Sequence, residues 1–190
     1  MIEQDSAQQR PTAQPSASQA MKHGRMLLIA YGNLSRRDDG VAFHVLRRLR
    51  QQLVANSGPS DADKEELIAG RVTAMRMHQL TPELAELLAE YAAVIFIDAH
   101  VQGAGWAPVH WEEISPGLRP SMVSHHLKPS SLLALCQMLY GRCPKGYILS
   151  VEGSDFDFGE HLSPTTSALA DQAVQRLIDF IRSESLETKD

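Results

Sequence analysis

Short apolar runs alternate with segments whose apolar residues recur at helical spacing. Residues 25–31 form an apolar run that stops at Gly32 and Asn33, which predicts a buried strand followed by a turn. From Val41 to Leu53 the apolar positions repeat as they do on one face of a helix. The first predicted unit is therefore a strand, a polar loop and a helix.

The same alternation continues toward the C-terminus. Further strands are predicted at 71–77, 93–97, 109–114 and 146–151. Further helices are predicted at 81–91, where Thr81 is the expected N-cap, at 130–139 after Pro129, and from Ser163 onward. Residues 56–66 are read as a solvated connection. This order predicts an α/β protein with an open, largely parallel sheet covered by helices on both faces.

The ends of the chain differ from its middle. Residues 1–24 show no apolar periodicity and are expected to be a disordered N-terminal tail. Residues 25–184 are expected to form a single domain, and 185–190 a short polar C-terminal tail. A chain of 190 residues is long enough for one domain to bury a core without disulfides.

Composition narrows the classes of function. A net charge of -5 argues against a nucleic-acid partner, because such proteins gather Lys and Arg on one face. The apolar runs fall far short of the ~20 residues that cross a bilayer, so membrane insertion is not expected. Two cysteines and a polar N-terminus without a signal sequence favour the reducing cytoplasm.

Polar residues follow the predicted strands where ligands collect in open sheets. Asp38 and Asp39 follow the first strand, and Asp98 is expected to end the strand at 93–97. His125 and His126 lie in a loop before the helix at 130–139. Two carboxylates and an imidazole suit nickel or zinc better than calcium or magnesium. These residues predict a metal site.

Plainer interpretations of the same residues stay open. Asp38 and Asp39 could cap the following helix, Asp98 could bond nearby backbone, and the two loop histidines could be surface residues. Cys136 is read as core and Cys143 as an exposed thiol in a turn. The other histidines of the folded region are read as structural: His44, His78, His100 and His110.

Residues 31–40, Tyr-Gly-Asn-Leu-Ser-Arg-Arg-Asp-Asp-Gly, resemble the G-N-x-L-x-x-D-[DE]-G signature of the hydrogenase maturation endopeptidases. Further blocks resemble that family in the same order: 78–84, 94–99, 124–135 and 153–164. The resemblance covers about residues 25–182. It implies a three-layer α/β/α sandwich with a mostly parallel, twisted sheet, phosphorylase/hydrolase-like in architecture.

The resemblance also implies roles for individual residues. Asp39, Asp98 and His125 would be the metal ligands, and the two aspartates would also be catalytic. His125 is preferred to His126 because it stands at the expected distance before the helix at 130–139. Asp38 would be an auxiliary base or would orient a ligand.

The implied function is that of an endopeptidase with an aspartyl-type family resemblance. It would recognise nickel in the precursor large subunit of a nickel-iron hydrogenase and cleave off the C-terminal peptide. Nickel would come with this substrate, and Gly32 and Asn33 would bring backbone close to it. Two alternatives remain: a non-proteolytic hydrogenase assembly factor, and a metal-dependent amidohydrolase on the same scaffold.

Overall fold

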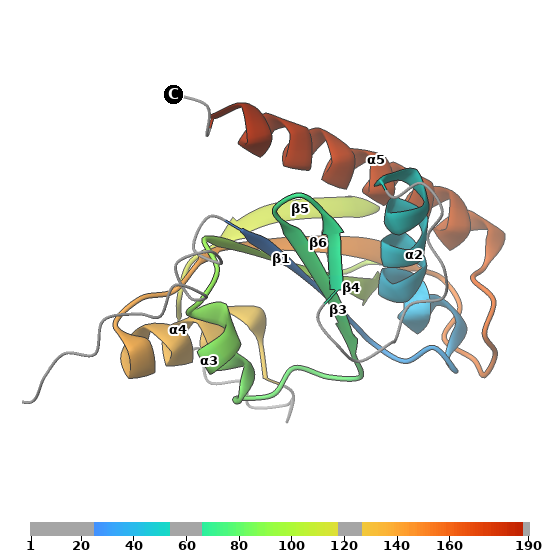
Figure 1. The fold of residues 1–190 in the computed structure, drawn as a ribbon. Coiled ribbons are helices and arrows are strands. Elements are labelled where there is room, and N and C mark those ends of the chain that lie inside the picture. Colours follow the sequence, from blue (N-terminus) through green and yellow to red (C-terminus); the bar gives the residue numbers. More distant parts are fainter. Residues whose placement is uncertain (1–24, 54–65, 118–126, 188–190) are drawn as a thin grey trace, which may run out of the picture.

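A six-stranded sheet forms the centre of the protein (Figure 1). In this computed structural model, residues 25–53, 66–117 and 127–187 are described. The strands are β1 (Met26–Tyr31), β2 (Glu66–Ala69), β3 (Val72–Met77), β4 (Ala93–Val101), β5 (Val109–Ile114) and β6 (Lys145–Gly153). The helices are the 3-10 helix η1 (Arg37–Gly40), α2 (Val41–Leu53), α3 (Leu84–Leu88), α4 (Pro129–Tyr140) and α5 (Pro164–Glu187).

The strand order β2-β3-β1-β4-β6-β5 makes the sheet mostly parallel. The four central strands β3, β1, β4 and β6 pair in parallel, whereas β2 and β5 pair antiparallel at the two edges. Parallel strands are covered on both faces, which explains why β1 is one continuous apolar run. The predicted sheet is thereby confirmed.

Helices cover both faces of the sheet (Figure 1). Leu28 and Ala30 of β1 pack in the core beneath α2 and α5, and Leu27 and Ile29 pack in the core beneath α3 and α4. This division follows from the alternation of side chains along a strand. The three-layer α/β/α sandwich is therefore confirmed.

Two predicted elements differ from the observed ones. Residues 56–66 were read as a connection up to Glu66, but Glu66–Ala69 forms β2, a short edge strand that the sequence analysis missed. The helix expected at 81–91 is confined to Leu84–Leu88. Thr81 does not cap it, because its hydroxyl bonds the side chain of Glu83 instead.

Asp98 does not end its strand. β4 continues to Val101 because it stays paired with β6 as far as Gly153. Its pairing with β1 stops at Ala30 and Ile97, so the last residues of β4 extend beyond the end of β1. Asp98 therefore lies where the neighbouring strand β1 ends, and it still reaches the carboxyl edge of the sheet.

Of the two predicted tails, the structure describes only part of the C-terminal one. α5 ends at Glu187, inside the segment 185–190 that was expected to be a tail. The predicted tail at 1–24 lies outside the described residues, as do His125 and His126 in segment 118–126. Within the described ranges, no helix is both long and apolar enough to cross a membrane.

Candidate functional site

Glycine is required where β1 turns toward η1. Gly32 has a φ of +142°, and a Cβ at this position would lie 2.2 Å from the backbone carbonyl oxygen of Asp39. Asn33 stabilises the turn, since its Oδ1 accepts a hydrogen bond of 2.9 Å from the Ser35 N–H. The turn thus folds directly against the residue that was predicted to be a ligand. The predicted contact of Gly32 and Asn33 with a substrate stays a prediction.

Asp98 is a partly exposed carboxylate with few donors. The backbone N–H of Ala99 donates to its Oδ1 at 2.8 Å, and the Tyr31 hydroxyl donates to its side chain. Burial raises the pKa of Asp98 to about 6, although both hydrogen bonds act in the opposite direction. Burial and the Asp98 carboxylate in turn raise the pKa of Tyr31 well above its ordinary value.

Asp39 lies close enough to Asp98 for its negative charge to raise the pKa of Asp98 further. The two residues come from η1 and β4, which contact each other. Both side chains are partly exposed. The structure therefore brings two of the predicted site residues together at the carboxyl edge of the sheet.

Such a pair is suited to a divalent cation, which would compensate two negative charges that repel each other. Asp98 shares the alternation of Phe96, so its side chain faces the α3 and α4 side of the sheet. Leu127, where the described chain resumes before α4, packs on that same side. In the described ranges, no three His, Cys, Asp or Glu side chains are grouped to hold a metal ion.

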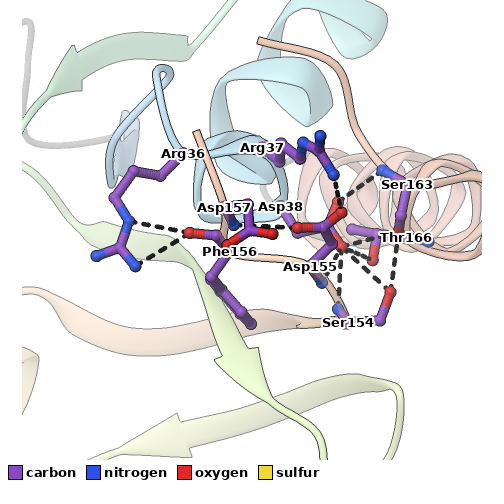
Figure 2. A network of polar contacts seen from close by, with 9 residues as sticks. All are labelled: Arg36, Arg37, Asp38, Ser154, Asp155, Phe156, Asp157, Ser163 and Thr166. Carbon is purple, nitrogen blue, oxygen red and sulfur yellow. Dashed lines mark hydrogen bonds and ion pairs between the residues drawn. The ribbon is translucent and has the colours of Figure 1, made fainter. Parts of the chain in front are cut away.

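Asp38 is held quite differently from its neighbour. Its side chain is fully buried and accepts backbone hydrogen bonds from Ser154, Asp155 and Ser163 at 2.9, 2.9 and 2.7 Å (Figure 2). The hydroxyls of Ser163 and Thr166 donate to its Oδ2 at 2.8 and 2.9 Å. Burial by itself raises the pKa of Asp38, but these hydrogen bonds outweigh burial and the pKa is lowered.

These bonds make Asp38 an anchor between two loops. None of its side-chain bonds goes to η1 or α2, so the capping interpretation of Asp38 is wrong. No carboxylate oxygen is exposed, so the geometry does not support an auxiliary base either. Ser163 does cap α5 as predicted, since its Oγ accepts a bond of 3.3 Å from the Thr166 N–H.

Two arginines complete the junction between the loops (Figure 2). The Arg36 guanidinium donates twice to the carbonyl oxygen of Phe156, at 3.1 and 3.0 Å, and Arg37 forms an ion pair with Asp155. The backbone N–H of Asp38 donates to the Asp155 carbonyl at 3.0 Å. Segments 35–38 and 154–163 therefore form one locked unit beside Asp39.

Tyr31 is the residue of this site that the sequence analysis missed. Its signal was a polar aromatic residue closing an otherwise apolar strand, one position before the required glycine. His100 agrees with its structural interpretation: it is buried, and its Nδ1 lies 2.9 Å from the Ser150 Oγ. Cys136 is in the core, as predicted.

Comparison of the sequence with models of protein families and with curated proteins finds no match. The fold, however, is that of solved hydrogenase maturation endopeptidases. The hydrogenase maturating endopeptidase HybD from E. coli superposes with a TM-score of 0.65 at 20% identity, covering 84% of this chain and 93% of that chain. A solution structure of an endopeptidase from Escherichia coli gives 0.60 at 19%, covering 84% and 93%.

A third structure extends the likeness to an archaeal protein. The [NiFe] hydrogenase maturation protease HycI from Thermococcus kodakarensis KOD1 gives a TM-score of 0.59 at 17% identity, covering 88% of this chain and 99% of that chain. At these identities the likeness establishes the fold. It confirms the architecture that the resemblance of residues 25–182 implied.

Proposed function

We propose that this protein is an endopeptidase that removes the C-terminal peptide from the precursor large subunit of a nickel-iron hydrogenase. The observation that carries the proposal is the Asp39–Asp98 pair, in which the pKa of Asp98 is raised to about 6. Perturbed carboxylates at the edge of an α/β sheet are typical of functional sites. Solved structures that share the fold include proteins named as a hydrogenase maturating endopeptidase and a [NiFe] hydrogenase maturation protease.

Asp39 and Asp98 would recognise nickel in the precursor by binding it. Asp39, Asp98 and the proposed third ligand His125 would bind an ion that the precursor already holds, so affinity for the loaded precursor exceeds that for the empty one. Binding of the cation favours the ionised form of Asp98 and offsets its burial. The Tyr31 hydroxyl orients this carboxylate, as outer hydrogen-bond partners of metal ligands do.

In this proposal Asp39 and Asp98 are catalytic because they hold the ion at the scissile peptide. A divalent ion with an open position polarises a carbonyl oxygen or activates a water molecule. Once the C-terminal peptide is removed, the large subunit is no longer the precursor form that the protein binds. The metal centre therefore belongs to the substrate, and the protein contributes the ligands that test for it.

The proposal is tested by incubating the purified protein with precursor, either nickel-loaded or nickel-free, and recording intact masses. We expect the mass of a C-terminal peptide to be lost only from the nickel-loaded precursor. Equal cleavage of both forms would contradict nickel recognition. Stable binding to the loaded precursor without any mass loss would make this protein a non-proteolytic assembly factor.

The third ligand is tested by two adjacent substitutions that change the same side chain. We expect His125→Ala to stop processing and His126→Ala to leave it near the wild-type rate, because only one imidazole completes the ligand set. The opposite pattern would assign the ligand to His126. Wild-type rates in both variants would remove the imidazole from the proposal.

A further inference from the structure

Strand β5 forms one edge of the sheet. Among the described residues, β5 lies last in the strand order and pairs with β6 alone, so its outer side carries backbone N–H and C=O groups without a strand partner. Proline and β-bulges, two devices that close such an edge, are absent from Val109–Ile114, which keeps one register with β6 throughout. The backbone of β5 can therefore accept a further strand.

The hydrogen bonds of β5 identify the residues that face outward. The Glu152 N–H donates to the Pro108 carbonyl at 2.8 Å, so Pro108 stands in a hydrogen-bonded position opposite β6. Because such positions alternate along an antiparallel pair, the backbone groups of Val109, Trp111 and Glu113 point away from β6. Their side chains share the α5 face of the sheet, since Val109 and Trp111 pack against the core beneath α5.

An open pocket of about 680 Å³ lies between β5 and α5. Val109 and Trp111 line it from the strand, and Arg176 and Phe180 are among the residues that line it from the helix. The guanidinium carbon of Arg176 lies 5.5 Å from the centroid of the Trp111 ring. In the described ranges, no carboxylate forms an ion pair with this guanidinium. The pocket beside the outward residues therefore presents an uncompensated positive charge.

A second copy of β5 matches this edge in an antiparallel register centred on Trp111. A two-fold axis there places Trp111 opposite its own copy and Val109 opposite Glu113 of the second copy, so that all three outward residues are paired. Glu113 of the second copy then stands on the α5 face, beside the pocket that Val109 shares with Arg176. The two-fold axis repeats this contact between a carboxylate and a guanidinium.

The other face of β5 has complementary charges in the same register. Glu112 of one copy stands opposite His110 of the other, and within one chain the His110 Nε2 lies 3.2 Å from the Glu112 Oε2. Like charges directly opposite each other would destabilise such a pairing, but each glutamate of β5 faces a histidine or a valine. The charges that discourage unrelated strands from pairing here are thus compatible with a second copy.

We propose that this protein forms a two-fold symmetric dimer in which the β5 strands of two copies pair and join the two sheets into one. The partner is a second copy because one register both pairs every outward residue and matches the charges on the two faces. In a dimer of this kind the same surface patch contributes from both copies, so each favourable contact occurs twice. The inference does not depend on the proposed function.

The test measures the dimer Kd of the full chain by size-exclusion chromatography with light scattering, over a range of concentrations. We expect a wild-type dimer. Glu113→Arg and Arg176→Glu should each raise the Kd about tenfold or more, because each brings like charges together, and the double variant should return it to near the wild-type value. Glu86→Arg is the matched control, an exposed glutamate on α3, and should leave the Kd unchanged.

Glu113→Pro tests the backbone pairing. The Glu113 N–H points away from β6, so proline removes a hydrogen bond between copies and none within the chain. We expect a monomer whose circular dichroism spectrum matches that of the wild type. A dimer that persists in this variant and in both charge variants would use another surface and would overturn the inference.

A wild type that is monomeric at every concentration would also overturn the inference, and two further measurements identify what the edge then binds. Slow hydrogen exchange of the Trp111 amide in a monomer would assign the edge to another segment of the same chain. A raised KM for the precursor in the Glu113→Pro variant of a monomeric protein would assign the edge to the precursor.

Discussion

Asp38 and Asp98 are carboxylates at the same edge of the sheet, yet their surroundings are opposite. Asp38 has no exposed surface, and hydrogen bonds from three backbone amides and the Ser163 hydroxyl lower its pKa. Asp98 is partly exposed and has only a tyrosine and one backbone amide as donors, and partial burial raises its pKa. The comparison shows that the number of donors, rather than burial, separates a carboxylate that holds the fold from one available to a ligand.

The largest expected effect is on precursor processing, when the proposed ligand Asp98 is substituted. Asp98→Asn should lower precursor processing by about 100-fold or more, because it removes a charged ligand while keeping the shape of the side chain. Processing rates from intact masses measure the loss. Asp157→Asn is the control, an exposed aspartate in the locked loop, and it should process normally. Processing by Asp98→Asn at the wild-type rate would remove Asp98 from the site.

The next largest effect is on the free energy of unfolding, when Asp38 is substituted. Asp38→Ala should lower the free energy of unfolding by about 3 kcal/mol or more, because several buried donors lose a charged acceptor. Urea unfolding followed by circular dichroism measures this change. Asp171→Ala is the matched control, since Asp171 is also a hydrogen-bonded carboxylate, with Arg48 as its donor, but its side chain is 71% exposed, and the substitution should cost at most about 1 kcal/mol. Equal losses in the two variants would contradict the anchor.

The pH dependence of stability should differ in sign between the two residues. The pKa of Asp98 is about 6 in the folded state and 3.8 ordinarily, so between pH 3.8 and 6 the folded state holds a proton on Asp98 that the unfolded state releases. The free energy of unfolding therefore falls as pH rises through this window. Asp98→Asn should therefore match the wild type near pH 4 and be more stable above pH 6, by about 3 kcal/mol.

Ionisation of Asp38 stabilises the folded state, because the pKa of Asp38 is lowered on folding. This contribution to the free energy of unfolding is present above the ordinary pKa of 3.8 and is lost as pH falls through the folded pKa. Urea unfolding of the wild type and Asp98→Asn across pH 4 to 8 checks the first sign. A variant that gains nothing above pH 6 would show that Asp98 ionises normally.

The smallest effect concerns the exposed part of the junction. Arg37→Gln should lower the free energy of unfolding by at most about 1 kcal/mol, because the Arg37–Asp155 ion pair is partly exposed and screened by solvent. Urea unfolding at low and high salt measures it. A loss as large as that of Asp38→Ala would mean that the ion pair, rather than Asp38, holds the two loops together.

Much of the fold could be predicted from local patterns. The apolar runs of β1 and β4, the proline that opens α4 and the Ser163 cap of α5 each depend on neighbouring residues. The length of β4 could not be predicted, because its continuation past Ile97 depends on pairing with β6, a strand distant in the sequence. β2 was missed for the same reason: a short edge strand is defined by its partner.

The candidate site was predictable in part. The convergence of Asp39 and Asp98 followed from adjacent parallel strands. The role of Asp38 did not, because its donors come from residues 154–166, more than a hundred positions away in the chain. Tyr31 was missed because its bond to Asp98 forms between two strands rather than within one.

The division of roles between Asp38 and Asp39 is tested by two adjacent substitutions, Asp38→Asn and Asp39→Asn, in the processing of nickel-loaded precursor. Both are assayed at a temperature where circular dichroism shows each variant folded. We expect Asp39→Asn to be folded but to process the precursor at least about 100-fold more slowly, whereas Asp38→Asn should be less stable and should still process the precursor. Normal processing by Asp39→Asn, or loss of processing by the folded Asp38→Asn alone, would contradict this division of roles.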